Sequence, residues 1–264
     1  MEEEKKTGSL SFILWLFAAL FFFLVIFYFS GYRLGNSLRV IAPGSVVLSG
    51  VPEESVIIVD GQEKAHVKKG QTEIKVKNIP AGSRTISVYR GDLWPWQKPI
   101  IISPGGASTL KPFLLAKEPS GAVVTSTDPE FVKVDTQIKT ELAKNEIMSH
   151  DGLITLIKDG NNLKARYNGE LKNAPAPFCE SDECIPEVIV FTAQNEIREI
   201  GFYKNRSDVA LMAVENAIYA LDIDSINFQN FQPLYKGKEP LFVKNEDDSV
   251  LYVEDSGSLM EIHW

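Results

Sequence analysis

Cys179 and Cys184 are the two cysteines of the chain, and they lie in the segment "PAPFCESDECIP" with four residues between them. Zinc would require two further ligands to complete a tetrahedron, and the sequence offers neither a second cysteine pair nor a nearby histidine. A redox dithiol has the shorter Cys-x-x-Cys spacing at the start of a helix. We therefore expect a disulfide that closes a small loop if this segment lies outside the cytoplasm, and free thiols if it lies inside.

The histidines, His66, His150 and His263, are scattered and form neither an HExxH nor an HxH arrangement. The sequence also contains no GxSxG nucleophile motif and no GxGxxG phosphate-binding loop. We therefore expect no metal site, no cofactor and no catalytic residue, and we assign no enzyme activity.

Acidic residues gather in three groups, at Glu180, Asp182 and Glu183 beside the cysteines, at Asp222 and Asp224, and at Glu246, Asp247 and Asp248. None of these groups has the spacing of an EF-hand loop, so we expect solvated turns and strand residues rather than a calcium site. One alternative function is an envelope glycan-acting enzyme that uses acidic residues as acid and base. It would need two carboxylates about 5 to 10 Å apart across a cleft.

Trp94 and Trp96 flank a proline in the segment "GDLWPWQK". Flat aromatic rings stack on sugar faces, so the pair is a candidate ligand-binding platform. The alternative is a turn whose indole rings cover one end of a domain, which is common for large aromatic residues.

Residues 12–29 read "FILWLFAALFFFLVIFYF", which is apolar on every helical face and carries no charge. At about 1.5 Å per residue such a helix can cross the roughly 30 Å hydrocarbon core of a bilayer. A cleaved signal peptide has a shorter apolar core, and small residues follow it. We therefore expect an uncleaved transmembrane helix over residues 12–32.

The charges around this helix nearly balance, with Lys5 and Lys6 before it and Arg33 and Arg39 after it. The amino group adds one positive charge to the leading tail, and long domains are translocated largely regardless of charge. We expect residues 1–11 to be a short cytoplasmic tail and the bulk of the chain to be extracytoplasmic, at a cell membrane. The net charge of −8 and the lack of a basic stripe argue against a nucleic-acid partner.

After a linker over residues 33–44, residues 45–115 show short Val- and Ile-rich runs broken by glycine turns. Apolar residues alternate with polar ones at Ile74 and Val76 and again at Ile86 and Val88, which is typical of strands with one buried face. The dipeptide Asp60-Gly61 predicts a tight hairpin turn. This pattern favours a small antiparallel β-sandwich.

The same segment resembles a PEGA domain, a small extracytoplasmic β-sandwich of bacteria. The resemblance rests on Val59-Asp60-Gly61, Gly70-Gln71-Thr72, Pro80-Ala81-Gly82-Ser83 and the closing "PIIISPGG". Two turns depart from the family pattern, because Gly-Thr-Pro has become "GQTE" and the usual Gly-Tyr turn has become "GDLWPWQK". These departures bear on any shared ligand surface more than on the fold.

Residues 116–130 are rich in Pro, Gly, Ser and Thr and are expected to be a second linker, with a β-rich unit over residues 131–264. In that unit "LITLIKDGNNLKARY", "VALMAVENAIYALDI" and "SVLYVEDSGSLMEIHW" each predict a hairpin. Their spacing is close to that of propeller blades, but the length allows only about three blades where a closed propeller needs about four. An open propeller fragment and a single sandwich both remain possible, and "DTQIKTELAKNEIM" fits a helix or a strand.

The whole chain resembles the PEGA-domain membrane proteins of candidate-phylum bacteria, with a PEGA-like sandwich followed by a propeller-like β tail. The resemblance implies no activity. We expect a single-pass envelope protein whose β domains bind or scaffold a cell-envelope glycan or a protein, without catalysis. A further alternative is an assembly or sensory partner that acts through the phenylalanine-rich membrane helix.

Overall fold

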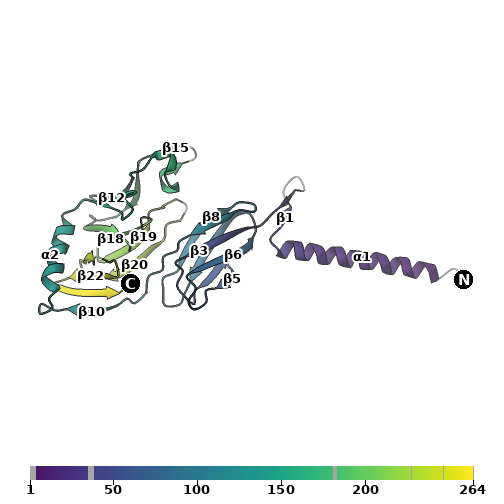
Figure 1. The fold of residues 1–264 in the computed structure, drawn as a ribbon, viewed down its shortest axis with the longest axis horizontal. Helices are drawn as coiled ribbons and strands as arrows, with labels where there is room; N and C mark the ends of the chain where they lie inside the picture. The colour runs from purple at the N-terminus through teal and green to yellow at the C-terminus, as the bar shows by residue number, and fades with distance from the viewer. Residues whose placement is uncertain (1–3, 35–38, 181–182, 227, 246, 264) are drawn as a thin grey trace. The chain divides into compact units, whose positions relative to one another are not determined.

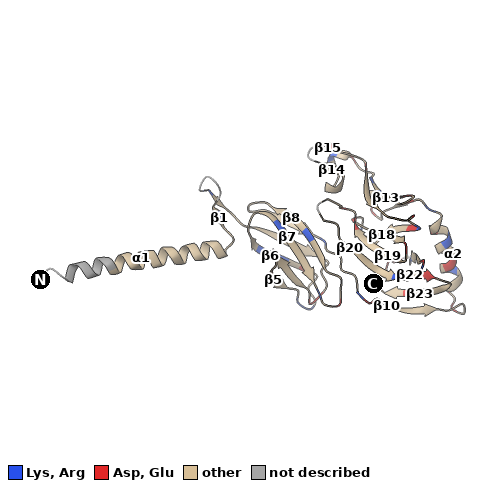
Figure 2. Ribbon diagram, turned by 180° about the vertical axis from the view of Figure 1, so that it is seen from behind, with Lys and Arg blue, Asp and Glu red and all other residues tan. Residues whose placement is uncertain are grey.

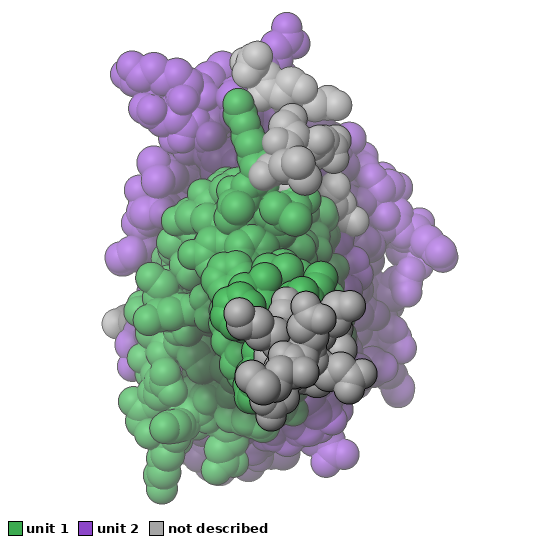
Figure 3. Space-filling model, turned by 90° about the vertical axis from the view of Figure 1, so that its right-hand side faces the viewer, with its two compact units in different colours: residues 1–88, 99–113 green, residues 89–98, 114–264 purple. Residues whose placement is uncertain are grey.

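The structure is a computed structural model, and it describes residues 4–34, 39–180, 183–226, 228–245 and 247–263. Strands account for 47% of it, which confirms an all-β architecture outside the amino-terminal helix. The chain forms two compact units (Figure 3). Unit 1 comprises Met1–Val88 and Pro99–Phe113, and unit 2 comprises Tyr89–Lys98 and Leu114–Trp264.

Helix α1, Glu4–Phe29, contains an uncharged stretch of 19 residues from Ser11 to Phe29, and Figure 2 shows neither a basic nor an acidic residue there. None of this stretch is buried in the protein, and Phe29 is 79% exposed. Apolar side chains on every face suit a hydrocarbon environment. Helix α1 is therefore long and apolar enough to cross a membrane. Strands β1, Arg33–Leu34, and β2, Val40–Ile41, follow it as an antiparallel pair.

The β-sandwich is built from two sheets, with strand orders β6-β3-β9 and β5-β4-β7-β8 (Figure 1). Its strands are β3 Gly44–Ser49, β4 Val56–Val59, β5 Gln62–His66, β6 Glu73–Ile79, β7 Gly82–Tyr89, β8 Trp96–Ile102 and β9 Ala107–Leu110. Alternate residues are buried, among them Ile74 and Val76 of β6 and Ile86 and Val88 of β7. The predicted one-face burial of these strands is therefore confirmed.

The turn between β4 and β5 is the tight turn predicted at Asp60-Gly61. Val59 pairs with Gln62, and both turn residues have positive φ, at 49° and 76°. Asp and Gly tolerate this conformation better than most residues, which is why the dipeptide is a strong hairpin signal. The Asp60 carboxylate also accepts a hydrogen bond from the backbone N–H of Thr85 at 2.9 Å.

Unit 2 contains three four-stranded antiparallel sheets, with orders β11-β12-β13-β16, β17-β18-β19-β20 and β10-β23-β22-β21. The first holds β11 Glu146–Met148, β12 Ile154–Asp159, β13 Asn162–Tyr167 and β16 Glu187–Thr192. The second holds β17 Glu199–Phe202, β18 Val209–Val214, β19 Ala217–Asp222 and β20 Phe231–Lys236. The third holds β10 Ser120–Val124, β21 Leu241–Lys244, β22 Val250–Asp255 and β23 Ser258–His263.

The three predicted hairpins are the central strand pairs of these sheets: β12 with β13, β18 with β19, and β22 with β23. Strand β10 was not predicted, because it lies within residues 116–130, where a linker was expected. It pairs along its length with β23, from Ser120 opposite His263 to Val124 opposite Leu259. The pairing joins segments that are far apart in the sequence, so local composition did not reveal it.

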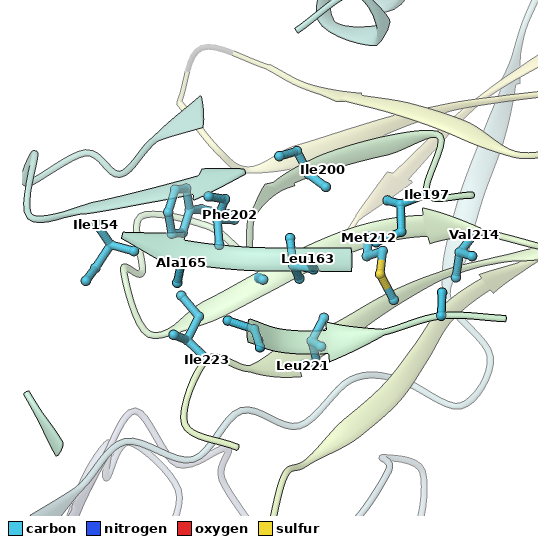
Figure 4. Packing of buried hydrophobic residues seen from close by; sticks show 14 of the residues in the cluster. Ile154, Leu163, Ala165, Ile197, Ile200, Phe202, Met212, Val214, Leu221 and Ile223 are labelled. Atoms are coloured by element: carbon cyan, nitrogen blue, oxygen red, sulfur yellow. The ribbon is translucent and has the colours of Figure 1, made fainter. Parts of the chain in front are cut away.

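One core of unit 2 lies between the first and second sheets. Figure 4 shows Leu163, Ala165, Met212 and Leu221 among the side chains that point toward one another there. A second core forms where helix α2, Phe131–Leu142, packs Val134 against the third sheet. The segment that fitted both a helix and a strand is thus helical as far as Leu142, and its last three residues, Glu146–Met148, form strand β11.

Two short 3₁₀ helices, Leu171–Asn173 and Ala176–Phe178, connect β13 to a hairpin formed by β14, Cys179–Glu180, and β15, Glu183–Cys184. Cys179 and Cys184 are directly opposite each other in this hairpin and form a disulfide. The predicted pairing is confirmed.

Candidate functional site

A hollow of about 320 Å³ lies in unit 2 where one edge strand from each of the three sheets contributes to the wall. These strands are β11, β17 and β21, and the carboxyl-terminal end of α2 adds Glu141. Edge strands carry backbone groups that are not used within their own sheet. The hollow therefore has polar backbone as well as side chains around it.

Glu199, the first residue of β17, is the most unusual group in this wall, because it is an acid that is only 1% exposed. Its Oε2 accepts a hydrogen bond of 2.6 Å from the backbone N–H of Phe242, at the edge of β21. Its Oε1 is buried and has no hydrogen-bond partner. One oxygen thus joins two sheets, and the other is buried without a partner in a residue that lines the hollow.

Burial raises the pKa of Glu199 to about 8, because removal from water disfavours the charged form. The N–H of Phe242 and the positive charges of Lys158 and Arg198 act in the opposite direction, whereas Glu141 raises the pKa further. At neutral pH Glu199 is therefore mostly a protonated, neutral acid. A protonated carboxyl group can donate one hydrogen bond.

The two cations near Glu199 are held by backbone carbonyls. The Lys158 ammonium donates to the carbonyl of Arg198 at 2.6 Å and to that of Leu142 at 3.2 Å. The Arg198 guanidinium donates to the carbonyl of Pro240 at 3.2 Å, and burial lowers its pKa. These bonds fix the ends of α2 and β12 beside β17 without an ion pair to Glu199.

Gly201, two residues along β17, leaves space for an aromatic ring at the same wall. A Cβ at this position would lie 3.0 Å from Cε2 of Phe242, closer than side-chain carbons normally approach. The Phe242 ring therefore rests directly on the backbone of β17, which in turn places the Phe242 N–H within reach of Glu199.

The remaining charged groups of the wall are balanced. Lys244 forms an ion pair with Asp248, and burial lowers the pKa of Lys204. At the rim, Met148 is 63% exposed, and His150 is also exposed. The hollow is therefore lined by exposed residues at its rim and by a buried acid at Glu199.

The predicted candidate ligand residues lie elsewhere in unit 2. Trp96 is 2% exposed, which argues against stacking on a ligand at that position. Trp94 is half-buried and lines a separate hollow with Pro233 and Tyr235, so its ligand role stays a prediction. The indole N–H groups of both tryptophans are buried without a hydrogen-bond partner.

The described residues of the predicted acidic groups are separate from the hollow or at its rim. Asp222 is 5% exposed, and its carboxylate accepts hydrogen bonds from Asn230. The Lys98 ammonium lies 2.7 Å from the Asp224 carboxylate and 3.9 Å from that of Asp222. These two carboxylates hold the Tyr89–Lys98 segment within unit 2, rather than facing solvent as expected.

In the group at residues 246–248, the Asp247 carboxylate accepts a hydrogen bond from the Ser249 hydroxyl. Asp248 lines the hollow and forms an ion pair with Lys244. Glu246 lies outside the described residues. Across the part of the chain that the structure describes, no three His, Cys, Asp or Glu side chains gather as a metal site would require.

Sequence reasoning missed Glu199 because the signal is a single acid that follows Arg198 and precedes apolar residues in "REIGFY". The same pattern occurs in many strands that expose one polar face. Compared with known proteins, the chain matches no family model and no curated protein.

Proposed function

We propose that this protein is a single-pass membrane protein whose two β units lie outside the cytoplasm and serve as a non-catalytic binding module of the cell envelope. The observation that carries the proposal is the disulfide between Cys179 and Cys184 in a chain that also has a helix long enough to span a membrane. Disulfides persist in oxidising compartments and are rare in the cytosol. The two features together favour an anchored domain that faces outward.

The shape of each unit supports a binding role. The sandwich has the Asp60-Gly61 hairpin and the alternating core strands of the PEGA-like pattern, and domains of this kind are small extracytoplasmic modules. Unit 2 has three four-stranded sheets, and the last of them is completed by strand β10, which is distant in the sequence. Both features support a propeller-like arrangement. We propose a glycan or a protein of the envelope as the partner.

The topology can be tested by labelling Cys179 and Cys184, the two cysteines of the sequence, in intact cells with a membrane-impermeant maleimide. We expect labelling only after treatment with an impermeant reductant. A Thr7→Cys variant in a background without the native cysteines is the matched control, and we expect it to be labelled only after lysis. Labelling of the native pair only after lysis and without reductant would place the β units in the cytoplasm and overturn the proposal.

A glycan-acting enzyme is the second candidate, because Glu141 and Glu199 line the same hollow and Glu199 carries a proton at neutral pH. A general acid with a raised pKa and a second carboxylate are the groups that glycoside hydrolysis uses. The discriminating assay is release of reducing sugar from purified envelope glycan. Release by the wild type that is abolished in Glu141→Gln and in Glu199→Gln would replace the binding proposal with the enzyme.

A further inference from the structure

Glu199 lines the hollow, and one of its two carboxyl oxygens is buried without a hydrogen-bond partner. The side chain is 1% exposed, its Oε2 is used by the N–H of Phe242, and its Oε1 has no partner. A buried polar atom without a partner is costly, and in native structures such atoms are few. A ligand atom in the hollow that hydrogen-bonds to Oε1 would remove this cost.

The charge of the wall indicates a neutral ligand. Apart from Glu199, the wall carries two acids, Glu141 and Asp248, and two lysines, Lys204 and Lys244, with the exposed His150 at the rim. The lysines would repel a cationic ligand, and the acids would repel an anionic ligand, so the wall favours neither sign of charge. Glu199 itself is neutral at pH 7 because burial raises its pKa to about 8.

The surfaces of the hollow suit a small ring that has apolar faces and polar edges. The partly exposed Ile147 and the exposed Met148 give apolar surface, whereas the exposed Asn205 offers an amide group. The volume of about 320 Å³ is at the lower end of the range of roughly 300 to 1,000 Å³ found for small-molecule sites. A single pyranose ring fits this size, with hydroxyl groups that accept and donate hydrogen bonds.

We propose that the hollow between β11, β17 and β21 binds one ring of an uncharged sugar, with Oε1 of Glu199 hydrogen-bonded to a sugar hydroxyl oxygen. This inference rests on the proposed function of a binding module and names its ligand class. It assigns to Glu199 a site role that the sequence did not reveal.

The test uses the purified full chain in lipid nanodiscs, because a glycoside detergent would compete for the site. Ligand binding is followed by saturation-transfer NMR and titration with four probes: glucose, N-acetylglucosamine, glucosamine and glucose 6-phosphate. The first two are neutral, and the others add a positive and a negative charge to the same ring. We expect at least one neutral sugar to bind more tightly than both charged ones.

Two variants of Glu199 isolate the hydrogen bond. Glu199→Gln keeps a neutral donor of the same shape, so we expect its affinity to stay within about twofold of the wild type. Glu199→Leu removes the donor and should weaken binding about tenfold, the loss expected for one hydrogen bond. Glu118→Gln, an exposed residue, is the matched control and should change nothing.

The pH dependence of sugar affinity distinguishes a hydrogen bond from Glu199 to the ligand from a purely structural role of Glu199. The groups that act on Glu199 are Glu141 of α2, Lys158 of β12, Arg198 beside β17 and the N–H of Phe242. We expect wild-type affinity for the neutral sugar to fall severalfold between about pH 7 and about pH 9, as the proton leaves Glu199, and that of Glu199→Gln to stay constant.

Tighter binding of glucosamine or of glucose 6-phosphate, no binding of either neutral sugar, or equal binding by Glu199→Leu would each overturn the inference. These outcomes are independent of the proposed topology, because binding is measured on purified protein and topology in intact cells. If no neutral sugar binds, the proposal of an anchored module still stands. If labelling places the β units in the cytoplasm, the sugar site itself still stands.

Discussion

Glu199 makes the stability of unit 2 depend on pH, because the folded chain resists its ionisation. Its pKa rises from an ordinary 4.5 to about 8 on folding, with burial as the main cause. Below pH 4.5 the acid is protonated in both the folded and the unfolded state, so it adds no pH dependence there. Between these two values only the unfolded state ionises, and stability is lost as pH rises.

The size of the effect follows from the same values. Each pH unit in this window costs about 1.4 kcal/mol of unfolding free energy, so the wild type loses about 3 kcal/mol by pH 7 and about 4 kcal/mol by pH 8. Glu199→Gln cannot ionise, and its amide oxygen can still accept from the N–H of Phe242. We therefore expect Glu199→Gln to be more stable than the wild type by about 3 kcal/mol at pH 7 and equally stable at about pH 4.

The assay is native-state hydrogen exchange by mass spectrometry on peptides that span β17 and β21. Comparing the wild type with Glu199→Gln at each pH cancels the intrinsic pH dependence of amide exchange. Glu118→Gln, an exposed acid, serves as the control and should match the wild type throughout. A difference between Glu199→Gln and the wild type that stays constant from pH 4 to pH 8 would refute the reasoning, because it would mean that Glu199 is ionised in the folded protein.

Two further perturbations test the disulfide and the packing at the hollow. Replacing both Cys179 and Cys184 with serine should lower the free energy of unfolding of unit 2 by about 2 kcal/mol, which is the chain-entropy estimate for so short a loop. Urea unfolding with and without reductant would measure this loss, and an effect of reductant on the serine variant would contradict the disulfide assignment. Gly201→Ala should cost about 1 to 3 kcal/mol, because its Cβ would lie 3.0 Å from the Phe242 ring, and thermal unfolding would measure the loss. Gly91→Ala is its control, since a Cβ there would meet only the Tyr89 hydroxyl at 3.9 Å, and equal losses in both variants would contradict the packing argument.

The strands that could be predicted were those whose signals are local. Asp60-Gly61 carries the conformational preference of its own turn, and the alternation through Ile74 and Val76 shows which face is buried. The central hairpin of each unit 2 sheet was found for the same reason, because both strands and the turn lie within about 15 residues of sequence. The close spacing of Cys179 and Cys184 likewise made the disulfide predictable.

The helix α2 and the strand β10 needed the folded context. Residues 131–142 alternate well enough to serve as a strand, and packing of Val134 and Ile138 on the third sheet decides for a helix. Strand β10 sits in a segment with the composition of a linker, and its pairing with β23 depends on a partner more than 100 residues away.

The sequence by itself determined the apolar helix, the all-β character and the short-range hairpins, because periodicity, turn residues and cysteine spacing act over a few residues. Only the tertiary structure decided that Glu199 is buried and that one of its oxygens has no partner. Those properties come from the meeting of β17, β21 and α2, which are distant in the chain. A pKa and a binding surface depend on what surrounds a side chain, and that environment forms only when the sheets pack together.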